Sequence, residues 1–425
     1  MSISTEAVAP APAARAAAGY EVAPAAGLSW RDLNPVVELA YGSFSTPDQL
    51  LESSAEVFEP ERSYVVRRGT ELCATLAVYS LSMTLPGGPQ PVAGIGYVTV
   101  SPAHRRRGLM RAMIQRTLTD LHEAGAEPLA MLNSTEVPLY GRFGFGPASR
   151  HLQLTIGRSA QALTSPPEPN LAPSFHAAPD CFDAIARIYR AASAERPGLF
   201  ARNAAWQRRA MLDPAEDRGS ASPLRCLLLA DGDGPRAYAL YAVQPGWHDG
   251  SAAHVVQVRE LFAADPAAYR EIWRVLLDLD LTASVVASRR PLDDPLLALL
   301  TDARAAVPVV QDELSVRVVD LPAALTRRTY AAEVNTVLEI ADPLCPWNAG
   351  RWRLDAGPDG ASCVRDRAAA DLSMSVRELG STMLGDAPLV QSAAAGLVAE
   401  HTPGAAAALA RALTHDRAPF CAMVF

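Results

Sequence analysis

In the first third of the chain, some segments have apolar residues at helical spacing and others have the apolar runs that are typical of strands. They predict a helix, three strands, a second helix and a last strand. These elements cover residues 36–40, 64–67, 73–81, 93–100, 109–124 and 129–132. Gly125 ends the second helix, because glycine readily adopts the left-handed conformation of a C-terminal cap. A loop rich in arginine and glycine therefore lies between the third strand and the second helix.

The same order of elements returns after a proline-rich linker at residues 166–173. Helical runs are followed by three strands, a helix and a strand. These segments cover residues 182–194, 203–212, 225–229, 237–243, 254–261, 269–277 and 282–287. The repeat is one of topology rather than of sequence. Its loop, residues 263–266, reads Ala-Ala-Asp-Pro, with no glycine and an added negative charge.

The two ends of the chain differ from this repeat. The last part opens with a strand at 315–319 and a helix at 321–329, continues with strands, then turns helical from 374 and ends in an apolar run. The first 27 residues are rich in alanine and proline and lack the pattern of a signal peptide, which predicts a disordered leader. The predicted segments are the leader 1–27 and domains over 28–165, 174–310 and 311–425.

Composition narrows the function. The 425 residues are 49% hydrophobic, enough for real cores, and carry a net charge of −8. Nucleic acid is therefore an unexpected partner. Six cysteines without a CxxC pair suit neither a zinc site nor a disulfide framework, which indicates a reducing cytoplasm and no metal. No apolar stretch approaches the roughly 18 residues of a membrane helix, so no membrane partner is expected.

The loop His104-Arg105-Arg106-Arg107-Gly108 carries the first chemical signal. A loop that enters a helix presents unpaired backbone N–H groups, and the helix dipole favours an anion there. Gly108 permits close approach, and arginine side chains bind phosphate oxygens in a fork. The loop is thus a candidate pyrophosphate cradle for a nucleotide or coenzyme A. The alternative is a solvated basic turn.

The second signal is the segment Leu139-Tyr140-Gly141-Arg142-Phe143-Gly144-Phe145, which follows the strand at 129–132. A tyrosine there lies beside the ends of two neighbouring strands. Its phenol is neutral at pH 7 and can donate a proton to a departing thiolate. The alternative is a packed aromatic residue in an aromatic and glycine-rich turn.

Together these motifs resemble the GNAT acetyltransferases, and more closely the Eis (enhanced intracellular survival) family. The resemblance rests on Arg105-x-x-Gly108 after Val98-Thr99-Val100 and on the segment around Tyr140, and it extends over nearly the whole globular part. It implies an α/β (α+β) chain with tandem GNAT folds, one active and one degenerate, and a C-terminal domain similar to sterol carrier proteins. It also implies a homohexamer.

The resemblance implies roles for individual residues. Tyr140 is expected to be the general acid for the coenzyme A thiolate, and the α-carboxylate of Phe425 is expected to accept the proton of the attacking amine. The remaining positions are expected to bind acetyl-CoA through its pantetheine arm, thioester and pyrophosphate. They are Val98, Val100, Arg105, Arg106, Gly108, Leu109 and Arg111.

The predicted function is acetyl transfer from acetyl-CoA to an amine by direct attack in a ternary complex. The expected acceptor is a cationic small molecule, such as an aminoglycoside or polyamine, or a lysine side chain. Some family members have an acidic residue before the terminal phenylalanine, where this chain has Val424, so aminoglycosides are one of several candidates. Two alternatives are a lipid or acyl-CoA carrier that uses the C-terminal domain and a regulator that binds acyl-CoA without turnover.

Overall fold

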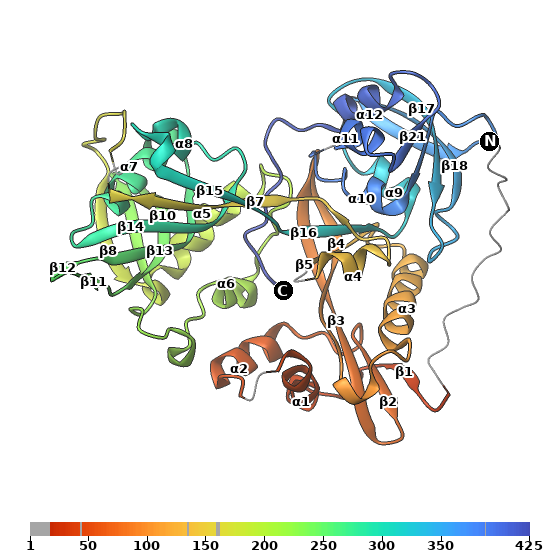
Figure 1. The fold of residues 1–425 in the computed structure, drawn as a ribbon, viewed down its shortest axis with the longest axis horizontal. Helices are drawn as coiled ribbons and strands as arrows, with labels where there is room; N and C mark the ends of the chain where they lie inside the picture. The colour runs from red at the N-terminus through yellow and green to blue at the C-terminus, as the bar shows by residue number, and fades with distance from the viewer. Residues whose placement is uncertain (1–17, 43–44, 134–135, 159–161, 387) are drawn as a thin grey trace.

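The computed structural model describes residues 18–42, 45–133, 136–158, 162–386 and 388–425. They form three domains, each built on one main sheet. In Figure 1 the first domain lies at the bottom in red and orange, the second at the left in green, and the third at the upper right in blue. The C-terminus lies at the centre, where the three domains meet.

The sheet of the first domain has the strand order β1-β2-β3-β4-β5-β16-β6. Its strands are β1 (Glu21–Pro24), β2 (Tyr64–Arg68), β3 (Glu71–Leu85), β4 (Gly88–Val100), β5 (Leu129–Asn133), β6 (Gly146–Pro147) and β16 (Leu314–Val318). Its helices are α1 (Trp30–Tyr41), α2 (Asp48–Val57), the short η1 (Pro102–His104), α3 (Leu109–Ala124) and α4 (Val137–Gly141).

Helix α3 packs on the sheet through the apolar stripe that predicts it. Leu109, Met113, Ile114, Leu118 and Leu121 are all buried, in one cluster with residues of β2 to β5. Both ends are set by glycine, because Gly108 and Gly125 have positive φ values of 74° and 67°. The packing fixes the N-terminus of α3 beside the end of β4.

The sheet of the second domain has the order β15-β7-β14-β13-β10-β9-β8, and a ribbon of β11 (Trp247–His248) and β12 (Ser251–Ala252) is attached to it. The strands are β7 (Arg150–Gly157), β8 (Ala172–Ala177), β9 (Arg225–Asp231), β10 (Gly234–Gln244), β13 (His254–Ala263), β14 (Thr282–Pro291) and β15 (Ala306–Asp312). The helices are α5 (Phe182–Ser193), α6 (Ala204–Ala210), α7 (Pro266–Leu277) and α8 (Leu296–Leu299), with short turns η3 (Ala178–Cys181), η4 (Ala215–Asp217) and η5 (Ala303–Ala305).

The third domain is built on a five-stranded sheet of order β19-β18-β17-β20-β21. Its strands are β17 (Val334–Ala341), β18 (Gly350–Gly357), β19 (Gly360–Arg365), β20 (Leu372–Ser375) and β21 (Val398–Glu400). Its helices are α9 (Leu321–Thr326), α10 (Val376–Gly380), α11 (Leu389–Ala394) and α12 (Ala405–Leu413). The segment from residue 374, predicted to be helical, is a strand end followed by the short α10.

The predicted domain boundaries are wrong at two strands. β7, placed in the first domain by the sequence, pairs with β14 and β15 in the second sheet. β16, placed in the third domain, pairs with β5 and β6 in the first sheet. Figure 1 shows both strands running between the lobes. Each sheet is therefore completed by a strand distant in sequence, which periodicity does not reveal.

The predicted leader is also too long. β1 pairs with β2, and Ala25 is buried under the same edge of the sheet. The residues Glu21–Pro24, which lie in the segment predicted to be disordered, thus form an edge strand of the sheet. The prediction for residues 1–17 lies outside the described residues.

The first and third domains are joined by a buried ion pair. Arg317 on β16 donates to both carboxylate oxygens of Asp342 at 2.7 and 2.8 Å, and both side chains are shielded from solvent. Asn348 donates to the same carboxylate at 3.1 Å. A buried charge needs such a partner, so the pair fixes the third domain against the sheet that carries the site.

Candidate active site

A cavity of about 930 Å³ opens in the first domain where β4 and β5 separate. The two strands are parallel partners only at Ala93 and Gly94, although β4 continues to Val100. Beyond this point the strands splay and leave backbone groups of β4 free to face a ligand. Every residue that the sequence assigns to the site lines this cavity: Val98, Val100, Arg105, Arg106, Gly108, Leu109, Arg111, Tyr140 and Phe425.

A bulge in β4 marks the centre of the cavity. Between the pairs Thr75–Thr99 and Ala77–Gly96, β4 has one more residue than β3. Tyr97 has a φ of 47°, which is unusual for a residue with a side chain. Its carbonyl oxygen accepts from the Thr75 hydroxyl at 2.9 Å instead of a ladder partner. Because a bulge interrupts the ladder, the backbone of β4 around Tyr97 and Val98 is available to face the cavity.

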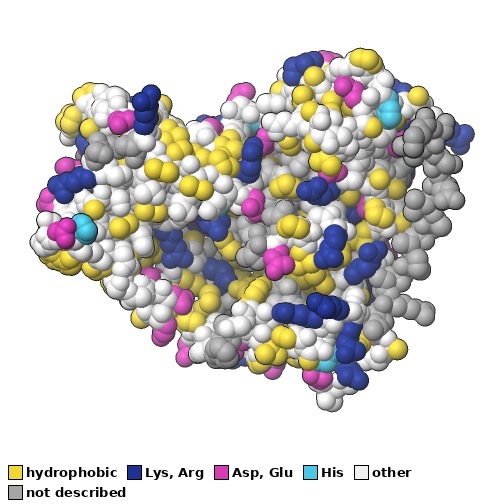
Figure 2. Space-filling model, viewed as in Figure 1, with side chains coloured by type: hydrophobic (Ala, Val, Ile, Leu, Met, Phe, Trp, Pro, Cys, Tyr) yellow, Lys and Arg dark blue, Asp and Glu magenta, His cyan; other side chains and the backbone are white. Residues whose placement is uncertain are grey.

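The arginine-rich loop lies at the far end of the cavity. The first helical bond of α3 runs from the Ala112 amide to the Gly108 carbonyl, so the amides before it extend beyond the helix end. A Cβ on Gly108 would meet no atom within 4 Å, so the space in front is open. Arg105 donates to the Ala40 and Val100 carbonyls, which fixes the loop. Figure 2 shows arginine side chains gathered over α3 and α4.

Tyr140 lies on α4 across from the loop and is half-buried. Its ring packs edge-on against Phe145, with centroids 6.1 Å apart. Burial, with nearby Tyr41 and Glu136, raises the pKa of the Tyr140 phenol above its ordinary value. The phenol is therefore neutral at pH 7 and faces the cavity as a proton donor.

Phe425 ends the chain inside the same cavity and is only 7% exposed. Its ring lies against Phe200 and Tyr79, with centroids 5.3 and 6.2 Å away. A Cβ on Gly96 would lie 3.0 Å from the terminal carbonyl group, and one on Gly94 would lie 3.1 Å from the ring. The two glycines of β4 thus make room for Phe425, and its carboxyl group lies on the strand next to the bulge.

The second domain holds the segment that leads to Phe425. The Phe420 amide donates to the Pro197 carbonyl at 3.0 Å, and Arg202 donates to the Ala422 carbonyl at 3.2 Å. Arg202 is itself fixed by two hydrogen bonds to Glu260, of 2.6 and 3.0 Å. Gly198 packs so closely that a Cβ would lie 2.7 Å from the Phe420 oxygen.

Glu313, just before β16, also holds this segment. Its carboxylate accepts from the Cys421 amide at 2.8 Å and the Ser149 hydroxyl at 3.1 Å. Burial raises the pKa of Glu313 to about 7, although these two donors and Arg289 act in the opposite direction. Burial also raises the pKa of the neighbouring Cys421 thiol to about 12. The segment is thus held next to a carboxyl group that titrates near neutrality.

Sequence reasoning did not find every residue of this cavity. Arg209 on α6 reaches it from the second domain and donates to the Tyr97 hydroxyl at 2.7 Å. His104, in the arginine-rich loop, also belongs to the lining; it is buried, and its ring nitrogens hydrogen-bond to Tyr20 and Glu71. These partners are distant in sequence, and no motif signals them.

The matching position of the second domain is a smaller hollow of about 390 Å³, and its loop carries an acidic side chain instead of arginines. Asp265 caps α7 by accepting from the Ala268 amide at 2.9 Å, and it pairs with Arg236 at 2.6 Å. Pro266 has no N–H. β13 and β14 pair from His254 to Val258 and part beyond it, so the two domains differ at the helix end rather than in the strands. An anion at this helix would therefore meet a carboxylate where the first domain offers free amides.

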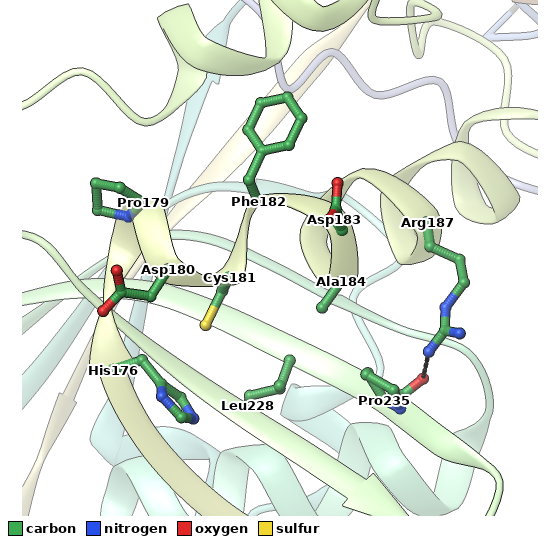
Figure 3. Close-up of a pocket in the computed structure, with 10 residues that line it drawn as sticks. All are labelled: His176, Pro179, Asp180, Cys181, Phe182, Asp183, Ala184, Arg187, Leu228 and Pro235. Atoms are coloured by element: carbon green, nitrogen blue, oxygen red, sulfur yellow. Dashed lines mark hydrogen bonds between the residues drawn. The ribbon is translucent and has the colours of Figure 1, made fainter.

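The second domain has another hollow, of about 560 Å³, between η3, α5 and the β9–β10 strands (Figure 3). Arg187 is the arginine in its lining, and it donates to the Pro235 carbonyl at 3.4 Å. Asp180 and Asp183 add negative charge there. This hollow has no cluster of cations for phosphates, unlike the loop at Arg105.

Comparisons with known families agree with this architecture. Residues 22–148 match a model described as an acetyltransferase (GNAT) domain, residues 198–318 match a second GNAT model, and residues 321–422 match a sterol carrier protein domain. The fold and these matches define the chain as a GNAT N-acetyltransferase with tandem GNAT domains.

Whole-chain relatives show which GNAT proteins it resembles. N-acetyltransferase Eis of Mycobacterium tuberculosis is 34% identical over 75% of this chain and 77% of its own. An uncharacterized N-acetyltransferase of Streptomyces avermitilis is 40% identical over 90% and 93%. The crystal structure of Eis1 from Mycobacterium abscessus matches with a TM-score of 0.79 at 30% identity, over 93% and 97%. The chain belongs to the Eis family of GNAT N-acetyltransferases, which confirms the predicted family and fold class.

Proposed function

We propose that the first domain binds acetyl-CoA along β4 and α3 and transfers its acetyl group to a primary amine in a ternary complex. The observation that carries this proposal is that Tyr140, Phe425 and the Arg105–Gly108 loop face one cavity. The loop and the amides of α3 would bind the pyrophosphate, and Val98 and Val100 would hold the pantetheine arm. Leu109 and Arg111 would complete the cradle.

The chemistry then needs two proton transfers and one charge to be stabilised. The amine nitrogen attacks the thioester carbonyl carbon, and a backbone amide of the β4 bulge donates to the oxyanion. The carboxylate of Phe425 accepts the proton that the amine loses. Tyr140 protonates the sulfur of coenzyme A as the carbon–sulfur bond breaks. Tyr140, the terminal carboxylate and the backbone amide would together supply these steps without a covalent enzyme intermediate.

The expected assembly follows from the family resemblance, and the expected location follows from the six cysteines that lack a CxxC pair. We propose a homohexamer in the cytoplasm. Exposed Val307, Val309 and Val310 on the edge strand β15 support an assembled state, since association would cover them. None of the described helices has the length and apolar character to cross a membrane.

The test is acetyl-CoA consumption with a panel of primary amines, with the acetylated product identified by mass spectrometry. Turnover that requires an amine and yields its N-acetyl product supports the proposal. Binding of acetyl-CoA without turnover on any amine would favour a regulator, and binding of lipid by the third domain alone would favour a carrier.

A further inference from the structure

The acceptor end of the cavity carries an arginine that the acetyl transfer described above does not use. Arg209 projects from α6 of the second domain and lines the cavity together with Tyr41, Tyr97 and Phe425. Consecutive residues of β4 relate it to the chain terminus. The terminal carbonyl group of Phe425 lies against Gly96, and the next residue, Tyr97, accepts a hydrogen bond from Arg209. The pyrophosphate loop begins several residues further along, beyond Val100.

The hydrogen bonds of Arg209 are all to neutral groups. Its Nη1 donates to the Ser53 and Ser54 hydroxyls at 3.3 and 3.1 Å, and its Nη2 donates to the Tyr97 hydroxyl. None of the described carboxylates forms an ion pair with it, whereas its neighbour Arg208 pairs with Glu56. A guanidinium has five N–H donors. Nε–H and one N–H of Nη2 are therefore left without a partner among the described residues.

Negative charge is scarce around this arginine. Among the described residues that line the cavity, Glu136 is the one acidic side chain, and it lies beside α4 rather than α6. Val424, which precedes the terminal residue, is 50% exposed and offers no charge. Of the described lining residues that the second and third domains contribute, Arg209 and the carboxylate of Phe425 thus carry the charges, one of each sign.

We propose that Arg209 binds an anionic group of the acceptor, so that the substrates of this site are primary amines that carry a carboxylate or a similar anion. A guanidinium binds a carboxylate through two parallel N–H donors, whereas a second ammonium group would meet a like charge. This narrows the acceptor expected from the sequence, because it disfavours polyamines and aminoglycosides. The inference rests on the acetyl transfer proposed above.

The test compares acceptors that share chain length and differ only in the group opposite the amine. A series of ω-amino carboxylates is assayed beside the corresponding amides and diamines. The wild-type enzyme is expected to show the highest kcat/KM with a carboxylate. Arg209→Met should lower that kcat/KM about 10- to 100-fold, the contribution of a charge-assisted hydrogen bond, and leave the amide nearly unchanged.

Two further variants separate charge from structure. Arg209→Lys keeps the cation and should retain the preference for the carboxylate. Arg208→Met removes a cation from the same helix outside the cavity and should change no acceptor ratio. Thermal unfolding shows whether each variant is folded.

The outcomes are distinguishable. A wild-type preference for the diamines, or an equal loss with every acceptor in Arg209→Met, would overturn the role of Arg209 and leave acetyl transfer intact. Failure of every amine to be acetylated would overturn the acetyl transfer itself.

Discussion

Tyr140 combines a neutral phenol with a place on the cavity wall, so its loss should affect one chemical step only. We expect Tyr140→Phe to keep the packing against Phe145 and to lower kcat about 10²- to 10⁴-fold, the usual contribution of a general acid. The Kd for acetyl-CoA, measured by calorimetry, should stay the same. A variant with near-normal kcat would make Tyr140 a packing residue.

Arg105 and Arg106 should act on binding instead. Their joint replacement by alanine is expected to weaken acetyl-CoA binding at least about tenfold, because charge-assisted hydrogen bonds to phosphate are lost. Arg107→Ala is the control, since its guanidinium lies over the Tyr20 ring and does not line the cavity. Equal Kd values for the double variant and the control would contradict the phosphate assignment.

Because the pKa of Glu313 is raised in the folded protein, we expect the stability of the protein to depend on pH. This pKa is raised to about 7 by burial, from an ordinary value near 4.5. Between these values the folded state binds more protons than the unfolded state, so this group lowers the free energy of unfolding as pH rises. Glu313→Gln removes that contribution.

Denaturant unfolding at pH values from 4 to 8 measures the contribution of Glu313 to the free energy of unfolding. The free energy of unfolding of the glutamine variant minus that of the wild type should increase from about pH 4.5 to 7 and level off above. The slope is at most about 1.4 kcal/mol per pH unit for one proton. A difference that does not change with pH would show that Glu313 does not titrate in this range.

The segment before Phe425 links the second domain to catalysis. Gly198→Ala would place a Cβ 2.7 Å from the Phe420 oxygen, so the segment must shift. We expect kcat to fall while acetyl-CoA affinity is kept. Gly219→Ala is the matched control, since Gly219 also has a positive φ, 58°, but has open space around it. Equal effects of the two substitutions would mean that backbone strain alone is responsible.

Helices and strands could be predicted from the sequence where each has a periodic apolar face that packs in the core. Helices α3 and α7 and strands β3, β4 and β13 lie where the spacing predicts, because each buries one face in a local unit. Periodicity gave no information on which sheet a strand joins, so β7 and β16 were assigned to the wrong domains. Arg209 and Glu313 were missed because their partners come from other domains.

At the scale of the whole molecule, the three domains contribute different parts of one site. The first supplies the cradle and Tyr140, the second supplies Arg209 and holds the terminal segment, and the third carries Phe425. One acetyl-CoA per chain is therefore expected at saturation, because Asp265 caps the N-terminus of α7 and places a negative charge where a phosphate would bind. Calorimetric titration of the intact protein gives this number. A second molecule bound per chain would contradict it.

The most direct test concerns the carboxylate of Phe425. Semisynthesis of the protein with Phe425 as an α-amide removes the charge and preserves the shape of the residue in its place beside Gly96. With a carboxylate as proton acceptor, the amide should bind acetyl-CoA normally and turn over about 10²- to 10⁴-fold more slowly with the same amine. Full activity of the amide would show that another group, or water, takes the proton.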